Sequence, residues 1–238
     1  MRRLVASLLA GFAGATACAT TPRADVEEIS AVAHSCVALA QEHAAQKHAA
    51  QYNPSAAEER NRCAPVGAVS GSDQTCWTSV QNPTARHLRY ATTYRKRAEE
   101  HRIASKLLRD AETRACTGIA GDDRDISPFW HREDIVRVEP FSVWGDDEVV
   151  SSGAIITFRP VPGLTVEWLQ RLVDCHLARN AALGHVVPDM PDCPLVPKGV
   201  RATVRPTQDG GLAVEISAED PETAAEVLAR ASRLVQRT

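Results

Sequence analysis

The feature that most restricts the fold is a pair of long segments, each with a single narrow stripe of small apolar residues. In residues 24–52 the stripe recurs at alternating spacings of four and three, which is typical of an amphipathic helix, and it consists of Ile29, Ala33, Cys36, Ala40 and His43. A second stripe runs through residues 82–116 and consists of Leu88, Ala91, Ala98, His101, Leu108, Ala111 and Ala115. Because each stripe has to be buried, the two helices are predicted to form an antiparallel hairpin.

Proline and glycine mark the ends of these two helices. Asn53-Pro54 ends the first, Asn82-Pro83 begins the second, and Gly118 stops it. The intervening loop of roughly 30 residues is long for a compact domain. A bridge between Cys63 and Cys76 is expected to keep it ordered, so residues 24–119 are predicted to be a helical hairpin with a disulfide-closed loop.

Residues 120–238 alternate between strand and helix patterns and predict a separate α+β domain. Its turn and capping signals are Asp209-Gly210-Gly211 for a hairpin, and Thr165 and Asp220 as helix N-caps. The order strand, strand, helix, strand, strand, helix indicates a small sandwich of mostly antiparallel strands with helices on one face. In topology alone, part of that order resembles ferredoxin-like and BON-type envelope modules. Strands are expected at 135–144, 153–159, 199–205 and 212–216, and helices at 165–182 and from 221 onward.

The first residues of the chain are typical of an export signal. Met1, Arg2 and Arg3 form a positive head, and residues 4–15 form an uncharged apolar run. That run lies within the roughly 7–15 residues of a signal-peptide core and is shorter than the roughly 20 that a membrane-spanning helix needs. The chain is therefore expected to be exported.

Small residues at Ala15, Thr16 and Ala17 precede Cys18, and this block resembles a lipobox, the bacterial signal for lipidation of a cysteine. It departs from the pattern at Ala15, where the box prefers leucine. The resemblance implies a signal peptide at 1–17, lipid on Cys18 and a tether at 18–23. Ala19 in place of aspartate then implies an outer-membrane lipoprotein that faces the periplasm or the surface. The same residues also suit an ordinary secretory peptidase, so a soluble periplasmic or secreted protein is the alternative.

The cysteine count agrees with the lipobox, because seven cysteines leave one over in an exported chain. With lipid on Cys18, the other six can close three bridges. Proximity in sequence favours Cys63–Cys76 and Cys175–Cys193, which leaves Cys36 and Cys116 to join the two helices, although six cysteines allow 15 pairings. No C-x-x-C spacing is present, so disulfides of an oxidising compartment are predicted rather than a zinc or haem site.

Charge argues against one class of partner. The formal net charge is −3, and an exported, net acidic protein is not expected to bind nucleic acid. Residues 86–114 nevertheless carry nine basic and four acidic side chains. This basic segment indicates complementarity to the acidic second half or to anionic lipid headgroups.

Several of the eight histidines stand where a metal could bind. His34, His43 and His48 lie on the first predicted helix, and His87 and His101 on the second. A hairpin brings His48 near His87, and imidazoles between facing helices can bind copper or zinc. The alternative is that these histidines are half-buried polar residues, since there is no Glu-x-x-His motif and no histidine pair four residues apart.

A second metal candidate combines His176, His185 and Met190, ligands that suit copper in an oxidising compartment. In the alternative, His176 shares a helix face with Leu169 and Leu172 as a core residue. Met190 then fills the core from a proline-rich loop.

Catalytic motifs are missing from the sequence. The segment Phe129–Asp134 mixes aromatic, basic and acidic side chains as a binding cleft does, but it also begins a domain, where aromatic residues commonly pack one element against the next. There is no phosphate loop, no G-x-S-x-G elbow and no H-E-x-x-H helix, and Ser105 and Ser127 have no assigned base. The predicted function is a non-enzymatic binding or structural module at the membrane surface, with an envelope protein as a partner. The alternative is a periplasmic copper-handling protein.

Overall fold

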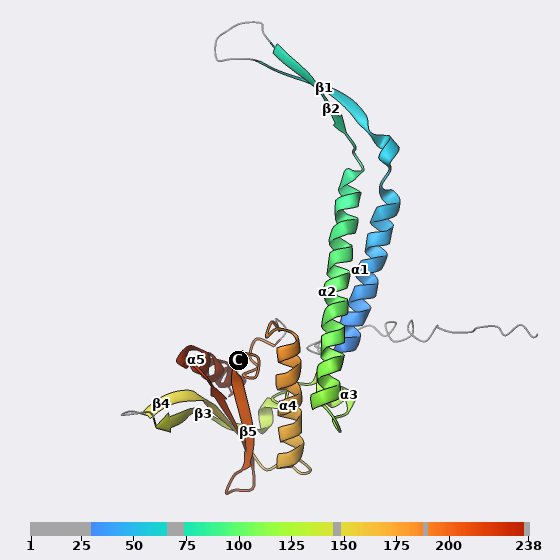
Figure 1. Ribbon diagram of the computed structural model, residues 1–238. Helices are drawn as coiled ribbons and strands as arrows, with labels where there is room; N and C mark the ends of the chain where they lie inside the picture. The colour runs from blue at the N-terminus through green and yellow to red at the C-terminus, as the bar shows by residue number, and fades with distance from the viewer. Residues whose placement is uncertain (1–29, 66–73, 145–148, 188–189, 236–238) are drawn as a thin grey trace, which may run out of the picture. The chain divides into compact units, whose positions relative to one another are not determined.

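The structure of the protein is a computed structural model that describes residues 30–65, 74–144, 149–187 and 190–235 (Figure 1). It forms two compact units. The hairpin unit is Ser35–Arg102, and the α+β unit is Met1–His34 with Ile103–Thr238. Helices α1 (Ala31–Gln51) and α2 (Ala85–Ala115) each contribute to both units, so the division falls within the helices and not at residue 120, where the composition changes.

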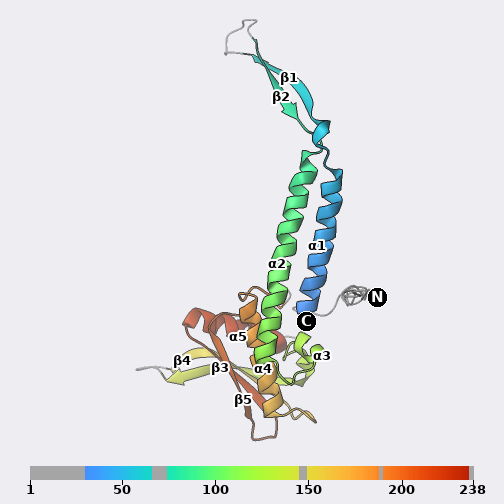
Figure 2. The ribbon, with the colours of Figure 1, turned by 45° about the vertical axis from the view of Figure 1, so that its right-hand side comes forward.

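In the hairpin unit the two helices pack through an alanine seam. The buried positions are Ala38 and Ala45 on α1 and Ala91 and Ala98 on α2, seven residues apart on each helix. Methyl groups allow two backbones to approach closely, and the two helices run side by side in Figures 1 and 2. An ion pair of 3.0 Å between Arg102 and Glu42 adds a link at the edge of the seam.

The predicted stripe of α1 is wrong. Ala40 and His43 are exposed, and Ala33 and Cys36 are half-buried. The helix is so rich in alanine that a small apolar residue occurs on every face, so spacing alone does not select the buried one. On α2 the prediction holds for Ala91, Ala98, Leu108 and Ala111, which are buried, whereas Leu88 is exposed.

The segment between the helices is a two-stranded ribbon and not the predicted loop. After a short 3-10 turn, η1 (Pro54–Ala56), strand β1 (Glu58–Pro65) pairs antiparallel with β2 (Gln74–Gln81). Nearly every described position of both strands is exposed, so no alternation of apolar and polar residues announces them. Cys63 lies directly opposite Cys76 in the register, and the two form the predicted disulfide.

The α+β unit contains the predicted antiparallel sheet with helices on one face. Its strand order is β3-β4-β6-β5. Pro140 lies in the edge strand β3, where a missing N–H costs least. The elements are β3 (Ile135–Trp144), β4 (Val149–Phe158), β5 (Val200–Pro206), β6 (Leu212–Ala218), α4 (Val166–Ala182) and α5 (Pro221–Val235), with short helices α3 (Gly121–Asp125) and η2 (Arg132–Asp134) before β3.

One apolar core holds this unit together. Alternate residues of the central strands, such as Ile156 and Val214, meet Val173 of α4 and Val227 of α5 in it. Both predicted helix N-caps are confirmed. Thr165 Oγ1 accepts from the amide of Trp168 at 3.2 Å, and Asp220 Oδ1 accepts from that of Thr223 at 2.8 Å.

Two of the expected cysteine pairings are wrong. Cys116, just after α2, is bonded to Cys175 of α4, so neither Cys36–Cys116 nor Cys175–Cys193 forms. The end of α2 packs near α4, which sequence distance does not show. Cys36 is disulfide-bonded as well, and Cys193 carries a buried thiol. The predicted lipidation site Cys18 lies outside the described residues.

Among the described helices, none combines the length and the apolar character that a membrane crossing requires.

Candidate functional site

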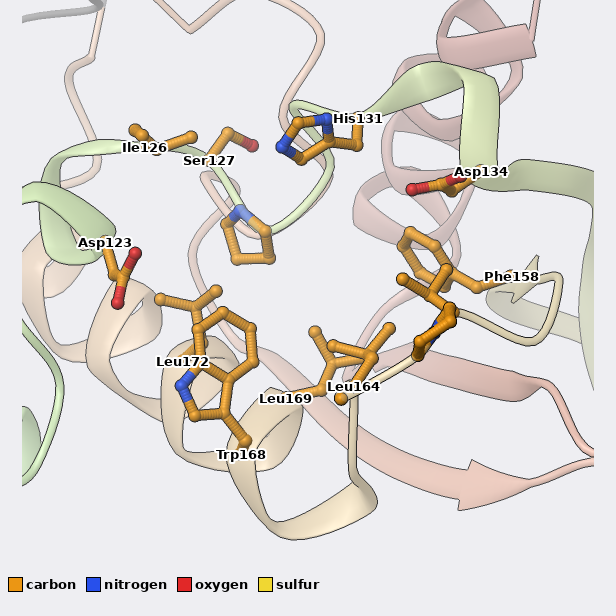
Figure 3. A pocket seen from close by; sticks show the side chains of 14 residues that line it. Asp123, Ile126, Ser127, His131, Asp134, Phe158, Leu164, Trp168, Leu169 and Leu172 are labelled. Carbon is orange, nitrogen blue, oxygen red and sulfur yellow. The ribbon is translucent and has the colours of Figure 1, made fainter.

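The α+β unit has a mainly apolar pocket of about 320 Å³ beside the N-terminal half of α4 (Figure 3). Its walls come from the segment between α3 and β3, from the end of β4 with the turn that follows, and from α4. In Figure 3, His131 and Asp134 lie across the hollow from Trp168 and Leu169. The apolar lining includes Ile126, Pro128, Phe158, Val161, Leu164, Trp168, Leu169 and Leu172.

Two of the polar groups around this pocket are fixed by neighbours. Arg159 donates from Nε and Nη2 to Oδ1 of Asp134, at 2.8 and 2.6 Å. His131 Nδ1 lies 3.1 Å from Oε1 of Glu133. The pKa of Glu133 is lowered by a hydrogen bond from its own backbone amide and by the contact with His131. Two carboxylates, those of Asp123 and Asp134, line the pocket.

His131, Glu133 and Asp134 also offer ligand atoms that lie within 4.8 Å of one another, close enough for one metal ion. Their present contacts compete with that role. Asp134 already accepts two hydrogen bonds from Arg159, and both His131 and Glu133 are exposed. Exposed acidic groups of this kind are common in proteins without a bound ion.

The segment Phe129–Asp134, singled out from the sequence, divides between two roles. Phe129 is buried and its ring stacks on Phe158 with centroids 6.2 Å apart, so this aromatic residue packs the domain together. Arg132 pairs with Asp192 at 3.1 Å. His131 and Asp134 line the pocket, so the binding interpretation and the packing interpretation each describe part of the segment.

A buried arginine joins three helices near the Cys116–Cys175 disulfide. Arg179 of α4 has no exposed surface, and its Nη2 donates to Asp125 of α3 at 2.6 Å. Its Nε lies 3.3 Å from the carboxylate of Glu112 on α2, which also pairs with Arg124 at 3.4 Å. Two carboxylates thus share one buried guanidinium. A buried charge is tolerated only with partners of opposite charge, and these two carboxylates provide them.

His176, His185 and Met190 lie in three different surroundings. His176 is fully buried one turn before Arg179, and burial together with the charge of Arg179 lowers its pKa to about 3. His185 has a left-handed backbone with φ of 61°, and its Nδ1 lies 2.9 Å from the carbonyl of Val196. Met190 is part of the apolar core. A cation next to Arg179 would be repelled, so His176 is better described as a core histidine.

The hairpin unit brings together one of the predicted histidine pairs. His48 of α1 and His87 of α2 meet with their Nδ1 atoms 3.1 Å apart. Tyr94 stacks on His48, with centroids 5.4 Å apart and planes 7° apart. His43, on the same helix, is exposed. The predicted antiparallel arrangement of the helices is what places His48 and His87 at the same level.

Sequence reasoning did not identify the pocket. Trp168 and Leu172 recur at helical spacing and were indistinguishable from core residues, and Leu164 stands in a turn. Only the neighbourhood of His131 and Asp134 carried a signal, through its mixture of aromatic and charged side chains. The pocket depends on the distance between α4 and the segment before β3, and no local pattern encodes that distance.

Comparisons of this chain with family models, with curated proteins and with solved structures found no match.

Proposed function

We propose that this protein is an exported, non-enzymatic binding protein whose α+β unit takes up a small apolar molecule. The observation that carries the proposal is the pocket beside α4, with Trp168 on one wall and leucines at its base. Its volume of about 320 Å³ lies at the lower end of the roughly 300–1,000 Å³ that ligand sites occupy. A group of one or two aromatic rings, or a branched aliphatic group of similar size, fits that volume.

The lining also suggests the polarity of the ligand. Asp123, His131 and Asp134 are the ionisable residues of the lining, and all three lie around the apolar walls. A ligand with an apolar body and a hydrogen-bond donor or an amine would satisfy both parts of the pocket. Trp168 offers a flat face, on which an aromatic ring stacks favourably.

Binding is favoured over catalysis by the contacts around Ser127, the hydroxyl that lines the pocket. Its Oγ accepts a hydrogen bond from the amide of Phe129 at 3.2 Å, and His131 contacts Glu133. A nucleophilic serine needs a base within hydrogen-bond reach. Hydrolysis of p-nitrophenyl acetate that disappeared in Ser127→Ala would contradict the non-enzymatic part of the proposal.

The export part rests on the leader at residues 1–17 and receives support from the disulfides Cys63–Cys76 and Cys116–Cys175, which persist in oxidising compartments. A lipid on Cys18 would hold the binding unit at a membrane surface, where an apolar ligand is at its most concentrated. This placement also agrees with the basic segment 86–114, which suits anionic headgroups.

A fluorescent titration tests the pocket. N-phenyl-1-naphthylamine, an uncharged apolar probe, is titrated into the full chain, into Trp168→Ala and into Trp144→Ala. Trp144 is 84% exposed and does not line the pocket, so it is the matched control. The expected result is saturable binding that weakens by about tenfold, or about 1.4 kcal/mol, in Trp168→Ala alone. Equal affinities for all three proteins would contradict the proposal.

A further inference from the structure

Two imidazoles from different helices approach each other in the hairpin unit, at the end of the helix pair that leads into the β1–β2 ribbon. His48 lies in the last turn of α1 and His87 in the first turn of α2. Their Nδ1 atoms are 3.1 Å apart, and their ring centroids are 5.4 Å apart with planes 27° apart. Two equivalent nitrogen atoms from two elements therefore face each other directly.

That separation is close to the one between two ligand atoms of a shared metal ion. With metal–nitrogen bonds of ~2.0–2.1 Å, two ligand atoms lie about 3.3–3.4 Å apart in a tetrahedral site and about 2.8–3.0 Å apart at adjacent corners of a square plane. The observed 3.1 Å falls between the two values. A shift of a few tenths of an ångström, smaller than a change of rotamer, suits either geometry.

The contact between the two rings also limits where their protons can lie. At 3.1 Å one Nδ1 donates a proton to the lone pair of the other, so both Nδ1 atoms cannot carry protons at once. When a metal ion binds, the donating ring changes tautomer and its proton moves from Nδ1 to Nε2. Both lone pairs then point at the ion, and no net proton is released.

The residues around the pair hold it in place. Tyr94 stacks on His48, and the ring of Tyr90 lies 5.2 Å from that of His48 and 6.4 Å from that of His87. Aromatic contacts on His48 restrict its χ angles, so little side-chain entropy is lost when an ion binds. Tyr90 is 49% exposed, which leaves the remaining coordination positions accessible to water.

We propose that His48 and His87 form a binding site for a divalent transition-metal ion, copper(II) above all. Copper(II) binds nitrogen ligands more tightly than the other divalent ions of the first row. The ion cross-links two helices whose buried seam residues, Ala38, Ala45, Ala91 and Ala98, are all alanines, so binding stabilises the hairpin unit. This site lies in a different unit from the apolar pocket and stands independently of the proposed ligand.

Electron paramagnetic resonance of copper(II) tests the site. One equivalent of copper(II) is added to the full chain in a His131→Ala background, which removes the other histidine and carboxylate cluster. The expected spectrum shows coupling to two imidazole nitrogens. His48→Phe and His87→Phe, which keep a ring in each position, lose that coupling, whereas His43→Gln, an exposed change on the same helix, keeps it.

Two results would contradict the proposed metal site. An unchanged two-nitrogen spectrum in both phenylalanine variants overturns the proposal. A second measurement avoids substitutions altogether, because diethyl pyrocarbonate modifies accessible imidazoles. Zinc ions are expected to slow modification of His48 and His87 at least fivefold while His43 reacts at its usual rate. Equal protection of all three, or of none, also rules the site out.

Discussion

Arg179 has no exposed surface, yet its guanidinium donates to a carboxylate that is one-third exposed, that of Asp125, at 2.6 Å. A second carboxylate, Glu112, lies 3.3 Å from Nε of the same side chain. The burial cost therefore falls mainly on the cation, while the anions keep part of their hydration. This arrangement joins the end of α2 to α3 and α4 through one side chain.

Truncation of this arginine is predicted to destabilise the α+β unit. Arg179→Ala removes the charge that both carboxylates share and opens a cavity, so a loss of about 3–5 kcal/mol in the free energy of unfolding is expected. Urea denaturation followed by circular dichroism measures it. Arg201→Ala is the control, because Arg201 pairs with Glu219 on the surface at 80% exposure of its side chain, and a change below about 0.5 kcal/mol is expected. Similar losses in the two variants would show that the buried Arg179 stabilises the α+β unit no more than a surface arginine does.

Removal of the Cys116–Cys175 bridge is predicted to cost more than removal of Cys63–Cys76. The first closes a separation of 59 residues and the second one of 13. From the entropy of the unfolded chain, the two bridges contribute about 4 and about 3 kcal/mol. Double serine variants of each pair, compared by thermal unfolding, measure the order. A larger loss from the Cys63–Cys76 variant would indicate that the ribbon, and not the joint between α2 and α4, limits stability.

Features that depend on neighbouring residues could be predicted from the sequence, whereas features that depend on long-range contacts could not. Local signals succeeded: Thr165 and Asp220 cap their helices, and Gly210 turns the β5–β6 hairpin with φ of 83°. The ribbon was missed because its strands lie in solvent on both faces and lack the alternation that burial imposes. Proximity in sequence correctly predicted Cys63–Cys76, but it failed for the other two bridges because α2 and α4 pack together and bring Cys116 to Cys175.

The candidate sites also differ in how far they could be predicted from the sequence. The approach of His48 to His87 followed from one topological assumption, the antiparallel hairpin, and from equal distances to the connection between the helices. The pocket required the relative placement of three segments around Trp168. Arg179 could not be identified, because an arginine near the end of a helix is normally a solvated residue.

Acid is predicted to destabilise the protein through His176 before most carboxylates titrate. Burial and the nearby Arg179 lower its pKa from 6.5 to about 3, so the folded chain keeps this imidazole neutral while the unfolded chain takes up a proton. Above about pH 6.5 this group does not lower the free energy of unfolding. As the pH drops from there towards 3, the free energy of unfolding falls by at most about 1.4 kcal/mol per pH unit. Unfolding free energies at pH 7 and pH 5 measure the effect. His176→Leu should lose less stability over that interval than the native chain, and an identical loss would assign the effect to other groups.

Lipidation of Cys18 is predicted from the leader, and intact-mass spectrometry of protein expressed with that leader tests it. The expected mass corresponds to a chain that begins at Cys18 and carries a diacylglyceryl group and an amide-linked acyl chain. Cys18→Ala should keep residues 1–17 or release a soluble, lipid-free product. The competing outcome involves Cys36, which is disulfide-bonded. A lipidated Cys18 has no sulfur atom left for a bridge, so peptide mapping without reductant that found Cys18 linked to Cys36 would exclude the lipid and favour the soluble secreted form.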